Sequence, residues 1–248
     1  MPTVAAVIPA RLGSTRFPNK VIYPLQGKPL LYYLVRSLEK SRQINRLIVA
    51  TDSREIVKAM QDVDVEVMMT SKRHRTGTDR VAEIATKVKS DIYLNIQADN
   101  MGLKAAELDR VIARFISERK EAFGTTVARV ENDEELANPN CVKVVVSKDG
   151  YARWFSRLPL PYIQKPDSVP LSEQFKFHKH IGIYIFRKNA IRQFADWGRS
   201  ASEKAESLEQ LRILENGGSI RAYETKMKTV SVDSPEDIDK TAAILVRK

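Results

Sequence analysis

The sequence predicts an α/β protein whose core is a doubly wound, mainly parallel β-sheet. The first observation is that strand-like and helix-like segments alternate, β-α-β-α-β-α-β-α, through the first half of the chain. The second is that the strand segments are short, apolar and rich in β-branched residues, as in strands buried on both faces. The third is that polar loops follow three of these strands, where open parallel sheets bind their ligands.

The first half contains four predicted strands and four predicted helices. The strands are the apolar runs 4–8, 46–50, 63–69 and 91–97. Helical spacing of apolar residues predicts helices over 28–40, 54–61, 78–88 and 105–119. Pro29 suits the first turn of its helix, and residues 51–53 suit an N-cap. Because helices connect successive strands, parallel strands with helices on both faces of the sheet are expected.

The second half has a different pattern. Strand-like segments occur at 123–130, 142–147, 151–155, 181–186 and 229–232, and Lys148-Asp149-Gly150 predicts a hairpin turn. Residues 158–170 hold four prolines and are expected to form a loop. Helices are predicted over 190–194, 206–214 and 235–246. No repeat or long linker divides the chain, so one domain over 1–248 is expected.

Composition limits the classes of function. With 43% hydrophobic and 29% charged residues in 248, the chain is typical of a globular protein. The single cysteine, Cys141, excludes an internal disulfide framework, and three histidines favour a hard cation on carboxylates over a transition metal. The net charge of +10 indicates an anionic partner, with a merely solvated basic surface as the alternative. No segment resembles a signal peptide or a membrane span, so the cytoplasm is the expected location.

Common nucleotide and hydrolase fingerprints are absent. No two glycines are spaced G-x-G, and Gly27-Lys28 is followed by Pro29, which excludes a Walker A loop. The first strand instead leads into a basic, hydroxyl-rich loop with a glycine that allows close backbone approach: Arg11, Gly13, Ser14, Thr15, Arg16 and Lys20. Cations and backbone donors in such a place suit a triphosphate. A solvated basic loop is the alternative.

Two aspartates are candidates for a Mg²⁺ site. Asp99 lies directly after the fourth strand, where a carboxylate can point into the ligand crevice. Asp233 follows the short strand 229–232 and precedes a predicted helix. Each aspartate could instead cap the helix that follows it.

Motifs along nearly the whole chain resemble the cytidylyltransferases that activate 3-deoxy-manno-octulosonate (Kdo) as its CMP-sugar. The first loop, Ile8-Pro-Ala-Arg to Lys20, would alone indicate only a sugar nucleotidyltransferase. Two later motifs make the resemblance specific: His180-Ile-Gly-Ile-Tyr184 and Leu208-Glu-Gln-Leu-Arg212. Further matches are Gly27-Lys-Pro29, Ala50-Thr-Asp52, Thr76-Gly-Thr-Asp-Arg80, Asn138-Pro-Asn140, Phe155-Ser-Arg157 and Val232-Asp-Ser-Pro-Glu-Asp237.

The resemblance implies a Rossmann-like nucleotide-diphospho-sugar transferase fold. It implies that CTP and an acidic sugar give a CMP-sugar and pyrophosphate, with Mg²⁺, for lipopolysaccharide or surface polysaccharide synthesis. It further implies a homodimer built through inserted strands and the Pro-rich flap between residues 127 and 187. No nucleic-acid partner is expected, because the basic run Lys72 to Arg75 lacks interleaved aromatic residues.

The resemblance also implies roles for individual residues. The catalytic residues would be Arg11, Lys20 and Asp99. The nucleotide would be bound by Ala10, Arg11, Ser14, Arg16, Lys20, Thr76, Gly77 and Arg80. The sugar acid would be bound by Gln97, Asn100, Arg157, His180, Tyr184, Glu209 and Gln210. The metal would be held by Asp99 and Asp233.

One segment departs from the family. The usual Gln-Gly-Asp-Glu-Pro is here Gln97-Ala-Asp-Asn-Met101, so a neutral amide replaces an acid beside Asp99. One interpretation is a different acceptor, a modified Kdo or a sialic-type nonulosonate. The other is a nucleotide-binding protein with weak or lost catalysis. The first is favoured because the other functional residues of the family are present.

Overall fold

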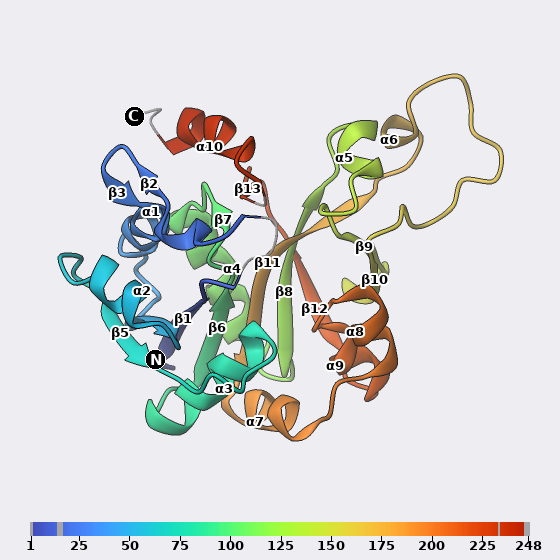
Figure 1. The fold of residues 1–248 in the computed structure, drawn as a ribbon. Helices are drawn as coiled ribbons and strands as arrows, with labels where there is room; N and C mark the ends of the chain where they lie inside the picture. Colours follow the sequence, from blue (N-terminus) through green and yellow to red (C-terminus); the bar gives the residue numbers. More distant parts are fainter. Residues whose placement is uncertain (1, 14–16, 233, 246–248) are drawn as a thin grey trace.

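The computed structural model describes residues 2–13, 17–232 and 234–245. Its centre is a nine-stranded sheet in the order β5-β4-β1-β6-β11-β8-β12-β10-β9 (Figure 1). The strands in that order are β5 (Glu66–Met69), β4 (Arg46–Thr51), β1 (Val4–Ala10), β6 (Ile92–Ile96), β11 (His178–Arg187), β8 (Phe123–Arg129), β12 (Ile220–Glu224), β10 (Tyr151–Ser156) and β9 (Lys143–Val146).

The first half of the chain forms the parallel part of this sheet. Strands β5, β4, β1 and β6 are all mutually parallel, as the alternation of the sequence predicts. Strand β6 is buried at every position, including Asn95, the polar residue within its apolar run. The predicted α/β class with a Rossmann-like sheet is confirmed.

The second half extends the same sheet with mostly antiparallel strands. β11 pairs antiparallel with both β6 and β8 and so joins the two halves. Its pairing with β8 shifts register between His180 and Tyr184, where Gly182 has φ +46°. This positive φ suits glycine and lets the strand bulge. The predicted hairpin is present as β9 and β10, with Gly150 at φ +81° in its turn.

Helices cover both faces of the parallel part. On one face, α1 (Leu30–Leu38) and α4 (Ala105–Ser117) pack on Val4, Ala6 and Ile8 of β1. On the other face, α3 (Gly77–Lys87) and α7 (Lys188–Asp196) pack on Ala5 and Val7. The remaining helices are η1 (Lys20–Ile22), α2 (Arg54–Ala59), α5 (Asp133–Ala137), α6 (Leu171–Gln174), α8 (Ala201–Glu206), α9 (Leu211–Glu215) and α10 (Asp237–Leu245). Within the described residues, no helix has the length and apolar character that a membrane crossing requires.

The helix expected over 206–214 is wrong as a single element. α8 ends at Glu206, Ser207 takes φ +53°, and α9 begins only at Leu211. The residues between the two helices turn their polar side chains toward the sheet instead of continuing the helix. Short strands that the sequence did not reveal are β2 (Pro24–Leu25), β3 (Lys28–Pro29) and β7 (Asn100–Met101). β7 pairs antiparallel with β13 (Val230–Ser231), which lies in the predicted strand 229–232.

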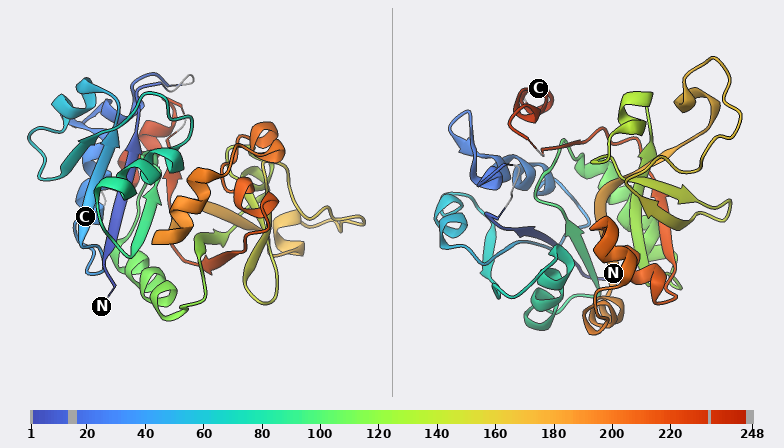
Figure 2. Two further views of the ribbon diagram at one scale, coloured as in Figure 1. Left: turned by 90° about the horizontal axis from the view of Figure 1, so that it is seen from below. Right: turned by 45° about the vertical axis from the view of Figure 1, so that its right-hand side comes forward.

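The Pro-rich segment forms a long loop that leaves the body of the molecule and returns through α6 (Figures 1 and 2). It carries several large apolar side chains in solvent. Tyr162 is 84% exposed and Leu158 is 69% exposed. Val169 and Phe175, also on this loop and just after α6, are exposed as well. This apolar surface has no partner within the described part of the chain that covers it.

Candidate active site

A cleft of about 530 Å³ opens at the carboxyl ends of the parallel strands. Its walls come from the loops after β1, β5 and β6 and from the segment between α8 and α9. The three polar loops singled out in the sequence therefore meet in one cleft. The predicted residues that line it are Ala10, Arg11, Lys20, Thr76, Gly77, Arg80, Gln97, Asp99, Tyr184, Glu209 and Gln210.

Lys20 and Asp99 are in direct contact on the cleft wall. The Lys20 ammonium donates to Asp99 Oδ2 at 2.6 Å and to the Val232 carbonyl oxygen at 2.8 Å. The Val232 amide donates to the Asp99 carbonyl oxygen at 3.0 Å, so the chain before Asp233 is held beside Asp99. Asp99 does not cap α4, whose N-cap is Lys104. With its side chain 27% exposed, Asp99 can meet a ligand in the cleft.

The start of α3 forms another part of the wall. Thr76 and Asp79 form a capping box: Thr76 Oγ1 accepts from the Asp79 amide at 3.1 Å, and Asp79 Oδ2 accepts from the Thr76 amide at 3.2 Å. A Cβ on Gly77 would lie 3.1 Å from Pro9 Cγ and 3.3 Å from Gln97 Nε2. Any larger residue here would force Pro9 or Gln97 to shift by a few tenths of an ångström. Thr76 and Gly77, at the start of this helix, thus border the cleft.

Arg80 lies in the same helix, and its side chain is held in place by hydrogen bonds. Its guanidinium donates to Asp52 at 3.1 Å and to the Thr70 hydroxyl, and its side chain is only 4% exposed. Arg80 therefore borders the cleft as a fixed positive charge.

Glu209 also lines the cleft and accepts hydrogen bonds through both carboxylate oxygens. Oε2 accepts from the Thr78 amide at 3.0 Å, and Oε1 accepts from Asn95 at 3.2 Å and Gln97 at 3.3 Å. Burial raises the pKa of Glu209, while the bonds from Thr78 oppose this rise. The carboxylate is fixed in place by groups from α3 and β6.

Gln210 has a donor without a partner. Its Oε1 accepts from the Tyr184 hydroxyl at 2.9 Å, while its buried Nε2 has no hydrogen-bond partner among the described residues. Burial also raises the pKa of Tyr184 well above its ordinary value. A buried amide donor that borders a cleft is a position where a ligand oxygen can bind.

Three predicted sugar-binding residues do not line the cleft. His180 Nε2 is 2.8 Å from the Thr125 hydroxyl, and its ring packs against Tyr184 with centroids 4.9 Å apart. Burial lowers the pKa of His180 to about 3. Arg157 donates to the carbonyl oxygens of Glu206 at 2.7 Å and of Pro139 at 2.9 Å.

Asn100 is the third. It is only 6% exposed, and its Nδ2 donates to the Ile181 carbonyl oxygen at 2.9 Å. The amide serves the packing of β7 on β11 and leaves the cleft wall to Gln97 and Asp99. Ser14, Arg16 and Asp233 lie outside the described residues.

Carboxylate oxygen is the ligand available for a cation in this cleft. Among the described residues no group of three His, Cys, Asp or Glu side chains could enclose a metal ion. A Mg²⁺ site does not require three protein ligands, because this ion commonly binds one or two carboxylates together with waters and substrate phosphates. Asp99 fits this requirement, and Asp233 is the second carboxylate that the sequence offers.

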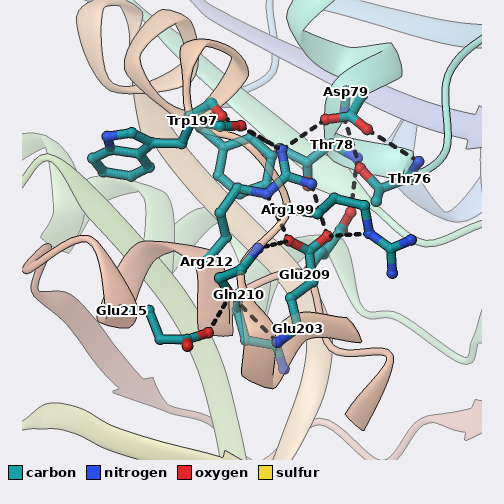
Figure 3. A network of polar contacts seen from close by, with 12 residues as sticks. Thr76, Thr78, Asp79, Trp197, Arg199, Glu203, Glu209, Gln210, Arg212 and Glu215 are labelled. Atoms are coloured by element: carbon teal, nitrogen blue, oxygen red, sulfur yellow. Dashed lines mark hydrogen bonds and ion pairs between the residues drawn. The ribbon is translucent and has the colours of Figure 1, made fainter. Parts of the chain in front are cut away.

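Two cleft residues, Arg199 and Glu203, were missed by sequence reasoning. His74 and Arg75 also line the cleft, as part of the polar loop that follows β5. Figure 3 shows Arg199 and Glu203 in a polar network with Arg212 and the capping box of α3. No motif marks Arg199. Asn95 does carry a signal in the sequence: a polar residue inside an apolar strand is usually held by specific partners, and here one partner is Glu209.

Comparisons with known proteins agree with this geometry. Residues 5–228 match the family described as cytidylyltransferase. A 3-deoxy-manno-octulosonate cytidylyltransferase of Geobacter metallireducens is 37% identical over 98% of both chains, and one of Geobacter sulfurreducens is 38% identical over 96% of this chain and 97% of its own. A solved structure of CMP:2-keto-3-deoxy-manno-octonic acid synthetase complexed with CTP superposes with a TM-score of 0.88, at 32% identity over 99% of each chain. The chain therefore belongs to the cytidylyltransferase family, which confirms the resemblance that its motifs carry.

Proposed function

We propose that this protein is a CTP:Kdo cytidylyltransferase that forms CMP-Kdo and pyrophosphate, for lipopolysaccharide or surface polysaccharide synthesis. The single observation that carries the proposal is the contact between Lys20 and Asp99 in the same cleft as Glu209 and Gln210. A cation suited to phosphate and a carboxylate suited to a metal thus share one cleft with polar groups suited to a sugar. The relatives with nearly full-length similarity are named for this activity.

The reaction is a displacement at phosphorus. The anomeric oxygen of the sugar acid forms a bond to the α-phosphorus of CTP, the bond to the β-phosphate oxygen breaks, and the hydroxyl proton passes to solvent. Such transfers depend mainly on positioning and on neutralising charge. Arg11 and Lys20 are placed to stabilise the charge that develops on pyrophosphate. The first turn of α3 would bind the nucleotide through Thr76 and Gly77.

Mg²⁺ would be held by Asp99 and Asp233. When bound, it supplies positive charge to the phosphates and favours ionisation of the attacking hydroxyl. Lys20 contacts the same carboxylate at 2.6 Å, so a phosphate-binding cation and the metal-binding Asp99 would lie side by side.

The sugar would bind at the wall formed by Gln97, Tyr184, Glu209 and Gln210. Glu209 accepts hydrogen bonds from sugar hydroxyls, and the Nε2 of Gln210 donates to an oxygen of the sugar acid. Kdo itself is the favoured acceptor. The case for a modified acceptor depended on Asn100 facing the sugar, and that side chain is bonded to Ile181 instead.

A pyrophosphate-release assay with Kdo and each of the four common NTPs tests this function. CTP is expected to give the highest kcat/KM. A preference for ATP, or no turnover with any NTP, would overturn the proposal. If CTP raises the Tm while no acid is turned over, the protein binds nucleotide without catalysis.

The assembly and location are also proposed. The exposed apolar side chains of the 158–175 loop, Tyr162 above all, favour burial against a second copy of the chain about a two-fold axis. The nucleotide substrate and the unpaired Cys141 favour the cytoplasm. The excess positive charge serves an anionic nucleotide and an acidic sugar, with no nucleic-acid partner required.

A further inference from the structure

We propose that Arg212 is a positioning residue that fixes the nucleotide wall of the cleft, at the start of α3, relative to the sugar wall at Glu209 and Gln210. The inference rests on the proposed function for the identity of the two substrates. It follows from a buried network that reaches both walls from a side chain that lines neither (Figure 3).

The Arg212 guanidinium is fully engaged. Its side chain is 2% exposed. It donates to both oxygens of Glu203, from Nε at 2.8 Å and from Nη2 at 2.7 Å. Nη1 donates to Asp79 Oδ1 at 2.9 Å, and the guanidinium lies 4.1 Å from the ring centroid of Phe194. A planar fork with this many partners has one orientation.

Asp79 links this fork to the nucleotide wall. One carboxylate oxygen accepts from Arg212 and the other accepts from the Thr76 amide in the capping box. Gly77 lies between them, with too little room for a side chain beside Pro9 and Gln97 without a local shift. A shift of Asp79 would therefore move the residues that border the triphosphate side of the cleft.

The other end of the network belongs to the sugar wall. The Arg212 amide donates to the Glu209 carbonyl oxygen at 3.2 Å, which joins the first turn of α9 to the segment between α8 and α9. The Glu209 side chain in turn accepts from the Thr78 amide. Two bridges thus leave α3: Asp79 to Arg212 in α9, and Thr78 to Glu209 in the segment before α9. They set the distance between the two substrate walls.

Matched substitutions test the proposal. Arg212→Lys keeps a positive charge but cannot reach Glu203 and Asp79 with one fork. Asp79→Asn weakens the same bridge at Asp79, which is more exposed than Arg212. This second variant keeps the test possible if Arg212→Lys does not fold. Arg221→Lys is the control, because this guanidinium also bridges two segments, donating to Glu118 at 2.9 Å and to the Asp149 carbonyl oxygen, but does not line the cleft. Calorimetric Kd values for CTP and Kdo are measured with the Tm of each variant.

We expect Arg212→Lys and Asp79→Asn to raise the Kd of both ligands roughly fivefold, with no further loss in the double variant because the two groups act through one link. The control is expected to lower Tm and to leave both Kd values within about twofold of the wild type. The proposal is overturned if Arg212→Lys lowers Tm and changes neither Kd, or if the two effects add fully.

Native-state hydrogen exchange separates this proposal from the proposed function. The Thr78 amide is expected to lose roughly tenfold in protection in Arg212→Lys and to keep its protection in Arg221→Lys. This readout requires no substrate. Failure of the wild type to bind CTP would refute the proposed function alone, whereas unchanged exchange at Thr78 would refute the role of Arg212.

Discussion

The side-chain amide of Asn100 donates a hydrogen bond to the Ile181 carbonyl oxygen, at the bulge of β11. The Gln97 amide donates to the next carbonyl oxygen, that of Gly182, at 3.2 Å. The turn that carries Asp99 is therefore fastened to the bulge by two bonds. Asn100, directly after Asp99, thus provides a side-chain donor that serves the backbone of β11.

Replacement of Asn100 by the usual residue is expected to destabilise the protein. In Asn100→Glu a buried carboxylate would face a carbonyl oxygen and leave it without a donor. The expected loss is roughly 3 kcal/mol in the free energy of unfolding, measured by urea denaturation. The ranking of ulosonic acids as substrates should stay the same.

Asn100→Asp provides the matched control for this prediction, because it removes the donor at nearly constant volume. It should lose stability in the same direction. A change in substrate ranking without a loss of stability in Asn100→Glu would show that residue 100 acts on the sugar.

Lys20→Met is expected to remove most of the activity. The ammonium that contacts Asp99 would be lost from the phosphate side of the cleft, and removal of one such electrostatic contact lowers kcat by roughly 10²- to 10³-fold. Lys20→Arg should have activity little above that of Lys20→Met, because the close contacts to Asp99 and to the Val232 carbonyl oxygen suit an ammonium and not a guanidinium. Steady-state kinetics with CTP and Kdo provide the measurement.

The control for this series is Lys28→Met, at an exposed lysine near the ring of Tyr32 and outside the cleft. It should retain wild-type kinetics. Comparable activity in Lys20→Met and Lys28→Met would contradict the role given to Lys20.

Metal removal is expected to stop turnover reversibly. Chelation with EDTA should abolish pyrophosphate release, and excess Mg²⁺ should restore it. Asp99→Asn should raise the Mg²⁺ concentration for half-maximal activity by at least about tenfold, because a neutral amide is a poorer ligand for a hard cation. Asp149→Asn, in the exposed hairpin, is the control. Full activity in EDTA would exclude this site.

The parallel half of the fold could be predicted because its signals are local. The apolar runs of β1 and β6 and the helical stripe of α4 each lie within a few residues of sequence. β12 was missed because Arg221 and Glu224 interrupt its apolar pattern, and its pairing with β8 is set by distant residues. The break at Ser207 was missed because Leu208 and Leu211 keep helical spacing across it.

The site was predictable only in part, because many of its contacts join residues that are distant in the sequence. The loops could be placed at one edge of the sheet from topology alone. Motif resemblance indicated Glu209 and Gln210, but not that Glu209 binds the start of α3. The contact of Lys20 with Asp99 joins residues 79 positions apart, and that of Arg212 with Asp79 joins residues 133 apart. Such pairings depend on the packed fold and leave no periodic signal.

A dimer is expected in solution. Light scattering at micromolar concentration should give twice the mass of 28.1 kDa. Tyr162→Glu places a charge on the most exposed large apolar side chain of the loop and should shift the protein toward the monomer. Met69→Glu, on the exposed edge strand β5, should leave the mass unchanged. A wild-type protein that is strictly monomeric would refute the dimer.

Below pH 7, the free energy of unfolding is expected to fall because of one histidine, His180. Burial lowers the pKa of His180 to about 3, whereas in the unfolded chain it is about 6.5. As the pH falls through 6.5, the unfolded chain gains a proton that the folded chain does not bind, so the free energy of unfolding decreases until the pH nears the folded pKa. At pH 5 this one group lowers the free energy of unfolding by about 2 kcal/mol relative to pH 8.

His180→Gln removes the titration and can keep a hydrogen bond to Thr125. The difference in unfolding free energy between variant and wild type should therefore shift in favour of the variant by about 2 kcal/mol between pH 8 and pH 5. Urea denaturation at the two pH values measures it, with carboxylates such as Glu83 contributing equally to both proteins. Because the imidazole stays neutral over this range, any contact it makes with an acidic sugar involves a neutral ring. A difference that does not vary with pH would mean that His180 titrates in the folded protein as it does in the unfolded chain.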